Sequence, residues 1–100
     1  MTIETICNLL LDALTEAGFN ESTLFNYKGV IRRFETFCNE KGVTDYTPEI
    51  GQAYADDVIS KKTGKYSAQR HYSQGRFSRL LTSYYNTGIF DLAVMKRGRQ

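Results

Sequence analysis

Apolar residues recur at every third or fourth position in four successive stretches of this 100-residue chain. This helical period is the strongest constraint on its fold, and it predicts helices over residues 2–17, 22–41, 48–64 and 66–86. Each stretch ends near a glycine that can stop a helix: Gly18, Gly42, Gly64 and Gly88. Nothing alternates with period two for long enough to indicate a strand. The sequence therefore predicts an all-α fold, with four helices in a compact arrangement joined by short loops.

The third expected helix has the clearest start. Thr47 is suited to cap it, Pro48 fits its first position, and Glu49 favours the positive end of the helix dipole. For the second helix, both Asn20 and Ser22 can serve as the cap. These signals locate the start of the third helix and leave two candidate caps for the second.

The same period sorts the cysteines and tyrosines into buried and exposed groups. Cys7 and Cys38 fall on apolar faces, which predicts buried, reduced thiols rather than a disulfide or a metal pair. The tyrosines expected on core faces are Tyr27, Tyr54, Tyr66 and Tyr84. Those expected to be more exposed are Tyr46, Tyr72 and Tyr85.

Three residues of the fourth expected helix depart from a simple amphipathic pattern. Arg70 falls in the core sector, so we expect it to extend along apolar surface or to pair with an acid from the first half of the chain. His71 is expected at the surface or its boundary, because no Ser, Cys or carboxylate is placed to form a nucleophile pair with it. Gly75 weakens the helix interior by about 1 kcal/mol relative to alanine and leaves room for a backbone or a phosphate to approach.

Charge is segregated along the chain, on either side of the bond between Asp57 and Val58. The first part has four basic and ten acidic residues, a formal charge of −6, and the rest has nine basic residues and Asp91 alone, a charge of +8. The net charge of +2 hides this asymmetry. A polyanionic partner is what such a distribution favours.

The basic residues of the fourth expected helix share a face with hydrogen-bonding side chains. Tyr72, Arg76, Arg79 and Ser83 follow the spacing i, i+4, i+7, i+11, with Gln69 beside them. Arginine contacts phosphates and guanine edges, while hydroxyl and amide groups add hydrogen bonds without opposing charge. The full set of candidate DNA-binding residues is Lys28, Arg32, Arg33, Lys65, Gln69, Tyr72, Arg76, Arg79 and Ser83.

Other classes of function find no support in the composition. One histidine and two cysteines do not make a metal-binding cluster, and Asp56-Asp57 is interpreted as a solvated helix face, so we expect no metal, no cofactor and no catalytic residue. The apolar run at residues 9–11 is too short for a signal peptide or a membrane span. We therefore expect a soluble, cytoplasmic protein that binds no membrane.

Three motifs together resemble the core-binding domain of tyrosine recombinases, the phage and transposon integrase family. They are Thr23-x-x-x-Tyr27-x-x-x-Ile31-x-x-Phe34-x-x-x-Cys38, Thr47-Pro48-Glu49-Ile50-x-x-x-Tyr54 and Arg79-x-Leu81-x-x-Tyr84-x-x-x-Gly88. The resemblance implies a SAM-like four-helix bundle that forms one half of a clamp on double-stranded DNA, with partner protomers in a synaptic complex. It also implies a bacterial or phage-encoded, nucleoid-associated protein.

In that family, a separate C-terminal domain cuts and rejoins DNA through a phosphotyrosine bond. Its His-x-x-Arg motif does not occur here, since His71 is followed by Tyr-Ser-Gln-Gly before Arg76. The resemblance thus implies a non-catalytic DNA-binding domain over residues 1–88. Residues 89–100 are apolar and then basic, without a clear helical period. They fit either a docked tail or a linker to the catalytic domain, and the linker is favoured.

Two other functions fit the same composition. A stand-alone helical transcription regulator would use residues 61–65 as the turn of a helix-turn-helix pair and would dimerise. A protein-interaction bundle would instead direct its basic helix at an acidic protein partner.

Overall fold

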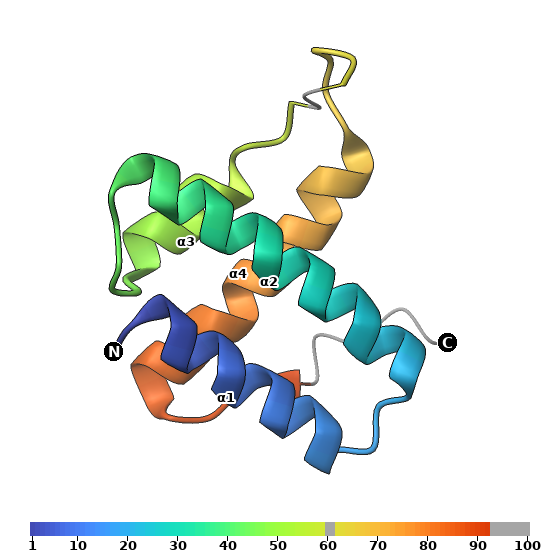
Figure 1. Ribbon diagram of the computed structural model, residues 1–100, viewed down its shortest axis with the longest axis vertical. Helices are drawn as coiled ribbons and strands as arrows, with labels where there is room; N and C mark the ends of the chain where they lie inside the picture. Colours follow the sequence, from blue (N-terminus) through green and yellow to red (C-terminus); the bar gives the residue numbers. More distant parts are fainter. Residues whose placement is uncertain (60–61, 93–100) are drawn as a thin grey trace. The chain divides into compact units, whose positions relative to one another are not determined.

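The computed structural model describes residues 1–59 and 62–92, and its four helices are drawn in Figure 1. They are α1 (Ile3–Glu16), α2 (Glu21–Lys41), α3 (Pro48–Ala55) and α4 (Ala68–Thr87). These described residues contain two isolated β-bridges but no strand. The predicted all-α class with four helices is therefore confirmed.

The chain divides into two compact units, each of which holds one pair of helices. Met1–Tyr46 contains α1 and α2, and Thr47–Gln100 contains α3 and α4. In the part of the chain that the structure describes, none of the helices is both long and apolar enough to cross a membrane.

The helices of the first unit begin at polar caps. Thr2 Oγ1 accepts a hydrogen bond from the Thr5 amide at 3.1 Å, and Asn20 Oδ1 accepts one from the Thr23 amide at 2.9 Å. Asn20, rather than Ser22, is thus the cap of α2. At the other end of α2, Gly42 adopts a φ of 72°, a left-handed conformation that glycine reaches without strain.

The apolar faces of α1 and α2 supply the core of the first unit. Their buried residues are Ile3, Ile6, Cys7, Leu10 and Leu14 from α1, and Val30, Ile31, Phe34 and Cys38 from α2. They recur with the helical period on which the prediction was based. Both cysteines are free and buried, as expected.

Tyr46 was expected to be exposed, and this expectation is wrong: only 1% of its surface is accessible. The segment after α2 is held to the start of α1 by backbone hydrogen bonds, from Ile3 N to Thr44 O at 2.9 Å and from Tyr46 N to Met1 O at 3.0 Å. These bonds position the Tyr46 ring against the ring of Phe34, with the two centroids 6.2 Å apart. Non-local backbone pairing, which no local period records, is the cause of the burial.

In the second unit, α3 begins as predicted but ends earlier. Thr47 caps it, with Oγ1 accepting from the Ile50 amide at 3.3 Å, and Pro48 is its first residue. The helix was expected to run to about Gly64, yet it ends at Ala55. The chain then leaves α3 and returns to α4 through a loop, which is yellow in Figure 1.

Extended pairing inside this loop explains the early end of α3. Ile59 forms a β-bridge with Tyr66, and the Ser67 amide donates to the Val58 carbonyl at 2.8 Å. Tyr66 therefore precedes α4 instead of opening it, and it is 60% exposed, so its predicted place in the core is wrong. Ser67 caps α4 in its place, accepting from the Arg70 amide at 3.2 Å.

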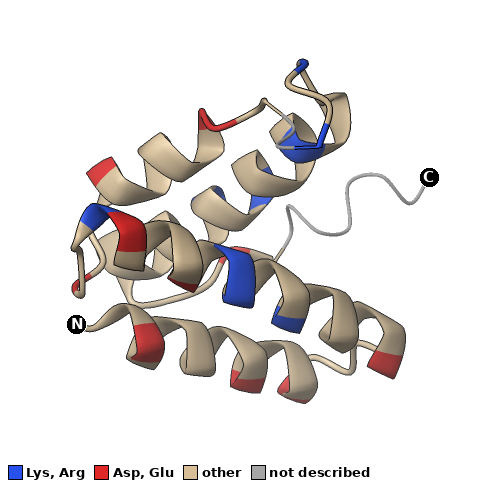
Figure 2. Cartoon of the chain, turned by 45° about the horizontal axis from the view of Figure 1, so that its top comes forward, with Lys and Arg blue, Asp and Glu red and all other residues tan. Residues whose placement is uncertain are grey.

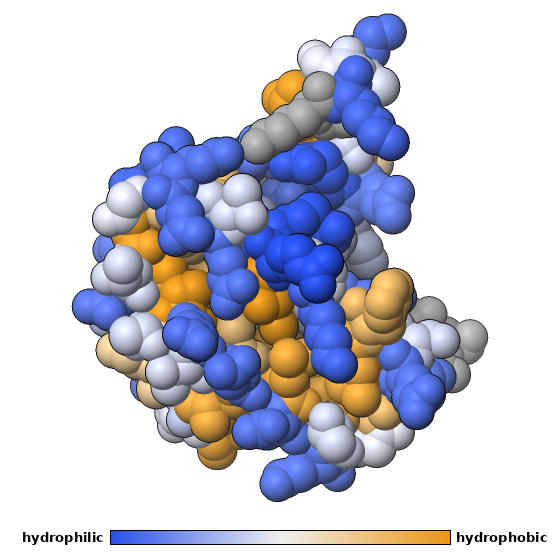
Figure 3. Space-filling view, in the orientation of Figure 1, coloured by the Kyte–Doolittle hydropathy of each residue, from blue (hydrophilic) through white to orange (hydrophobic). Residues whose placement is uncertain are grey.

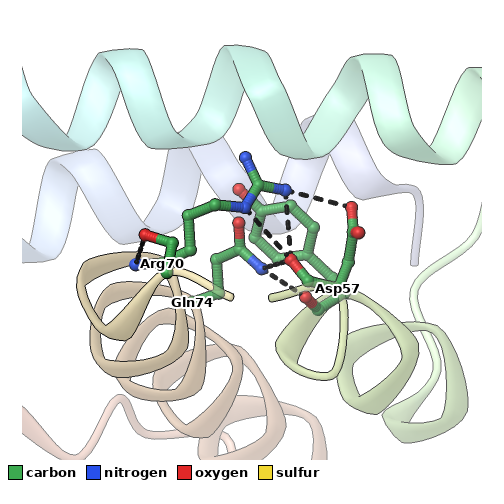
Figure 4. Close-up of polar contacts among 5 residues, drawn as sticks. Asp57, Arg70 and Gln74 are labelled. Carbon is green, nitrogen blue, oxygen red and sulfur yellow. Dashed lines mark hydrogen bonds and ion pairs between the residues drawn. The ribbon is translucent and has the colours of Figure 1, made fainter. Parts of the chain in front are cut away.

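Side chains of α4 hold the end of α3, as Figure 4 shows. The amide of Gln74 donates to the carbonyl oxygens of Tyr54 at 2.6 Å and Asp57 at 2.8 Å. Arg70 donates from Nε and Nη2 to the same Asp57 carbonyl, at 3.2 and 3.1 Å, and its Nη2 pairs with the Asp57 carboxylate at 3.1 Å. Arg70 thus pairs with an acid from the first half of the chain, one of its two predicted outcomes. Asp57 is not part of a purely solvated face.

Aromatic contacts complete the second unit. Tyr54 meets Phe77 edge to face, with centroids 6.0 Å apart, and Tyr84 stacks on Phe90 at 4.5 Å. Phe90 is only 8% exposed, so its ring is docked, whereas its neighbour Ile89 is 70% exposed. Tyr84 of α4 thus holds Phe90 in place, and the linker interpretation of residues 89–100 stays a prediction. Residues 93–100 lie outside the described part of the chain.

Replacing Gln74 by leucine should destabilise the protein. The side chain is 4% exposed, and its loss leaves the Tyr54 carbonyl without this donor, at a cost on the order of 1–3 kcal/mol in the free energy of unfolding. Urea denaturation followed by circular dichroism measures this change. Gln69→Leu, at an exposed position of the same helix, is the control and should change stability by no more than about 0.5 kcal/mol. Equal effects of the two substitutions would contradict the role assigned to Gln74.

The two thiols should be unreactive in the folded protein. Burial, with a further contribution from the Glu35 carboxylate, raises the pKa of Cys7 from 9.0 to about 12 and that of Cys38 from 9.0 to about 11. At pH 8, reaction with Ellman's reagent should therefore be slower than in urea by about 1,000-fold for Cys7 and about 100-fold for Cys38, since the thiolate is the nucleophile.

The same shifts set a dependence of stability on pH. Because the folded state binds both protons more tightly, their contribution to stability is fully present below pH 9.0 and is lost as the pH rises toward 11–12. Fast modification of either thiol at pH 8 under native conditions would show that the core opens at that position.

Candidate nucleic-acid interface

The helix α4 carries positive charge along its length without any acidic residue. Its sequence holds Arg70, Arg76 and Arg79 and neither Asp nor Glu, whereas α1 holds three acids and no base. Figure 2 shows this contrast as blue bands on one helix and red bands on the other. Arg70 is engaged by Asp57, so Arg76 and Arg79 are the arginines available to a partner.

Tyr72 and Arg76 form a pair one turn apart on α4. The Arg76 guanidinium lies over the Tyr72 ring, 4.5 Å from its centroid, and Arg76 Nη2 donates to the Tyr72 hydroxyl. Stacking and hydrogen bonding restrict both side chains, which lowers the entropy lost when either one binds a ligand. Tyr72 remains 57% exposed, so its ring stays accessible.

Arg79 and Gln69 extend the same helix surface in both directions. Both are exposed, and within the described residues no carboxylate pairs with Arg79. Ser83, predicted with them, is half-buried and serves the fold. Its hydroxyl donates to the Leu80 carbonyl at 2.8 Å and accepts from the Asp91 amide at 2.9 Å. Ser83 therefore fixes the segment that follows α4.

The loop before α4 adds further basic residues. Lys62 and Lys65 are both exposed, and the Lys65 amide donates to Thr63 Oγ1 at 3.3 Å. Figure 3 shows the hydrophilic surface of this loop at the top of the view. The exposed cations among the described residues of the second unit are therefore Lys62 and Lys65 in the loop and Arg79 on α4, with Arg76 half-buried between them.

The remaining predicted residues belong to the first unit. Lys28 and Arg32 are one turn apart on α2, Arg33 follows, and all three are exposed. None of them forms an ion pair with another described residue. They make a second basic surface, on a helix whose opposite side is buried.

A hollow between α3 and α4 escaped the sequence-based prediction. It has a volume of about 270 Å³ and is lined by Gln52, Ala55, Asp56, His71, Tyr72, Gly75, Ser78 and Arg79. The sequence had predicted only a surface or boundary position for His71 and a solvated helix face for Asp56. The residues from α4 follow the spacing i, i+1, i+4, i+7, i+8, a single helix face that could have been recognised from its central glycine.

Within the described residues, no group of three or more histidine, cysteine or acidic side chains is placed to hold a metal ion. The candidate site is instead made of arginine, lysine, tyrosine and amide groups, which bind anions and hydrogen-bonding surfaces. Comparisons of the chain with protein-family models, with curated proteins and with solved structures found no match.

Proposed function

We propose that this chain binds double-stranded DNA through Arg76 and Arg79 of α4 and the exposed lysines of the loop before it, as a core-binding domain of the tyrosine recombinase kind. The observation that carries the proposal is an acid-free helix on which Arg76, Arg79 and exposed Tyr72 share neighbouring turns. Guanidinium groups contact phosphates, and aromatic and amide groups add contacts to sugars and bases. Lys28, Arg32 and Arg33 provide a second set of phosphate contacts from α2.

The proposed role is to position an enzyme rather than to cut DNA. The parent protein would be a recombinase of a bacterial or phage mobile element, acting on DNA in the cytoplasm with its other protomers. Strand cleavage in such enzymes belongs to a separate catalytic domain. The support for this class is the set of three sequence motifs, whose residues lie on or cap α2, α3 and α4.

The structure gives little support to a helix-turn-helix regulator. That motif joins its two helices through a turn of about 3–4 residues. Here the connection between α3 and α4 spans residues 56–67 and contains its own β-bridge between Ile59 and Tyr66. The alternative is an acidic protein partner. Failure of the chain to bind DNA in the experiment below would favour it.

Binding to a fluorescent duplex, measured by anisotropy, tests the proposal. If about six phosphates are contacted, log K should fall with log[salt] with a slope of about −5 between about 50 and 200 mM salt. Arg79→Gln should weaken binding about three- to tenfold and make the slope less steep by about 1, because one phosphate contact is lost.

Lys41→Gln is the matched control for this measurement. It removes the same charge from an exposed residue at the end of α2, outside the candidate set. It should change the affinity by less than about twofold, as expected for a charge that meets no phosphate. A flat salt dependence, or equal effects of the two substitutions, would overturn the proposed interface.

A further inference from the structure

Gly75 occupies the middle of α4 although neither its backbone nor its packing requires glycine. Its φ is not among the positive values, which the described glycines adopt only at Gly18, Gly42, Gly64 and Gly88. A Cβ atom built at position 75 would meet nothing within 4 Å. Glycine is less favourable than alanine in a helix interior. The stability of α4 therefore does not explain why position 75 is a glycine.

That space belongs to the hollow between α3 and α4. Gly75 lies at the centre of the α4 face that lines it, one turn from His71 and Tyr72 on one side and from Ser78 and Arg79 on the other. A side chain at position 75 would occupy part of the hollow. Its volume, about 270 Å³, lies just below the range of about 300–1,000 Å³ typical of small-molecule sites, which suits a compact ligand.

The side chains around the hollow include a cation, an aromatic ring, a carboxylate and a hydroxyl. Arg79 offers a cation at one side, and Tyr72 offers an exposed aromatic ring. Asp56, at the end of α3, offers a carboxylate whose Oδ1 accepts from the Gln52 amide at 3.0 Å. Ser78 is 7% exposed, and its hydroxyl has no hydrogen-bond partner among the described residues. The site can thus accept N–H groups, stack a planar ring and bind an anion at its edge.

We propose that the hollow between α3 and α4 holds one unpaired nucleobase that carries an amino group, with the phosphate of the same nucleotide on Arg79. The Asp56 carboxylate accepts from the amino group, and the Tyr72 ring stacks on the base. A bare phosphate fits less well, because Asp56 would repel it. This inference rests on the proposed DNA-binding function and specifies which part of the DNA the second unit recognises.

The test compares the affinities of four fluorescent hairpin duplexes for the intact chain. One is fully paired, and the others carry a single bulged guanosine, cytidine or thymidine. Guanine and cytosine have exocyclic amino groups, whereas thymine has none. The guanosine and cytidine bulges should bind at least about fivefold more tightly than the paired duplex, the gain expected for one stacked base. The thymidine bulge should gain less.

Gly75→Leu tests whether the gain arises in the hollow. Leucine is a good helix former, so the melting temperature should not fall, but the side chain should abolish the preference for the bulge and leave binding of the paired duplex within about twofold. Gly75→Ala keeps the comparison interpretable should leucine disturb the fold. Gly29→Ala in α2 is the matched control: its Cβ would lie 3.7 Å from Arg33 Nη1, an ordinary contact, and it should leave the preference intact.

Asp56→Asn separates recognition of the amino group from a structural role of the hollow. It should reduce the difference between the guanosine and thymidine bulges without weakening binding of the paired duplex, because only the charged acceptor is removed. A structural role would lower all affinities together.

The outcomes distinguish the two proposals. Binding of the paired duplex with no preference for any bulge would overturn the nucleobase site and leave the DNA-binding function standing. Absence of binding to every hairpin would overturn the DNA-binding function itself. A preference for all three bulges that survives Gly75→Leu would place base recognition elsewhere and also overturn the inference.

Discussion

The second unit depends on the hydrogen bonds that α4 side chains make to the end of α3. A helix ends with carbonyl groups that have no partner within the helix. Here Gln74 and Arg70 supply the donors, and three of their N–H groups converge on the carbonyl of Asp57. The bond from the buried Gln74 to the Tyr54 carbonyl is shielded from water and costly to lose, and the partly exposed Arg70 bonds add to it. They fix how α3 and α4 face one another, and therefore how the hollow between them is shaped.

How much of this fold could be predicted depends on whether the determining contacts are local. The starts of α2 and α3 could be predicted because Asn20 and Thr47 bond amides only three residues away. The end of α3 could not, because it depends on the pairing of Ile59 with Tyr66 in the next loop and on Gln74, 20 residues beyond Tyr54. Tyr46 and Tyr66 were placed wrongly for a related reason. Both rings lie at or next to β-bridges outside the helices, so the helical period does not determine whether they are buried.

The candidate site divides along the same line. Tyr72, Arg76 and Arg79 could be placed on adjoining turns from the sequence, since α4 is a regular helix over 20 residues. The contact of the Arg76 guanidinium with the Tyr72 ring follows from their spacing of i and i+4. The hollow could not be predicted, because three of its eight lining residues come from α3 and its C-terminal cap, and its shape depends on how the two helices pack. Gly75 was the one sequence feature that indicated the hollow, because glycine is unfavourable in a helix interior.

The neighbouring acids Asp56 and Asp57 show why charge counted along the chain was an incomplete guide. They were grouped with the acidic first half, yet both belong to the second unit. Asp57 pairs with Arg70 and so neutralises the one arginine of α4 that serves the fold. Asp56 lines the hollow with Arg79, and Gln52 bonds one of its oxygens. One acid thus removes a cation from the surface, while its neighbour gives the basic face a point of negative charge. A purely basic surface would bind phosphates with little discrimination between sequences. A carboxylate within that surface adds an acceptor that can bond the N–H groups of a base but not a phosphate.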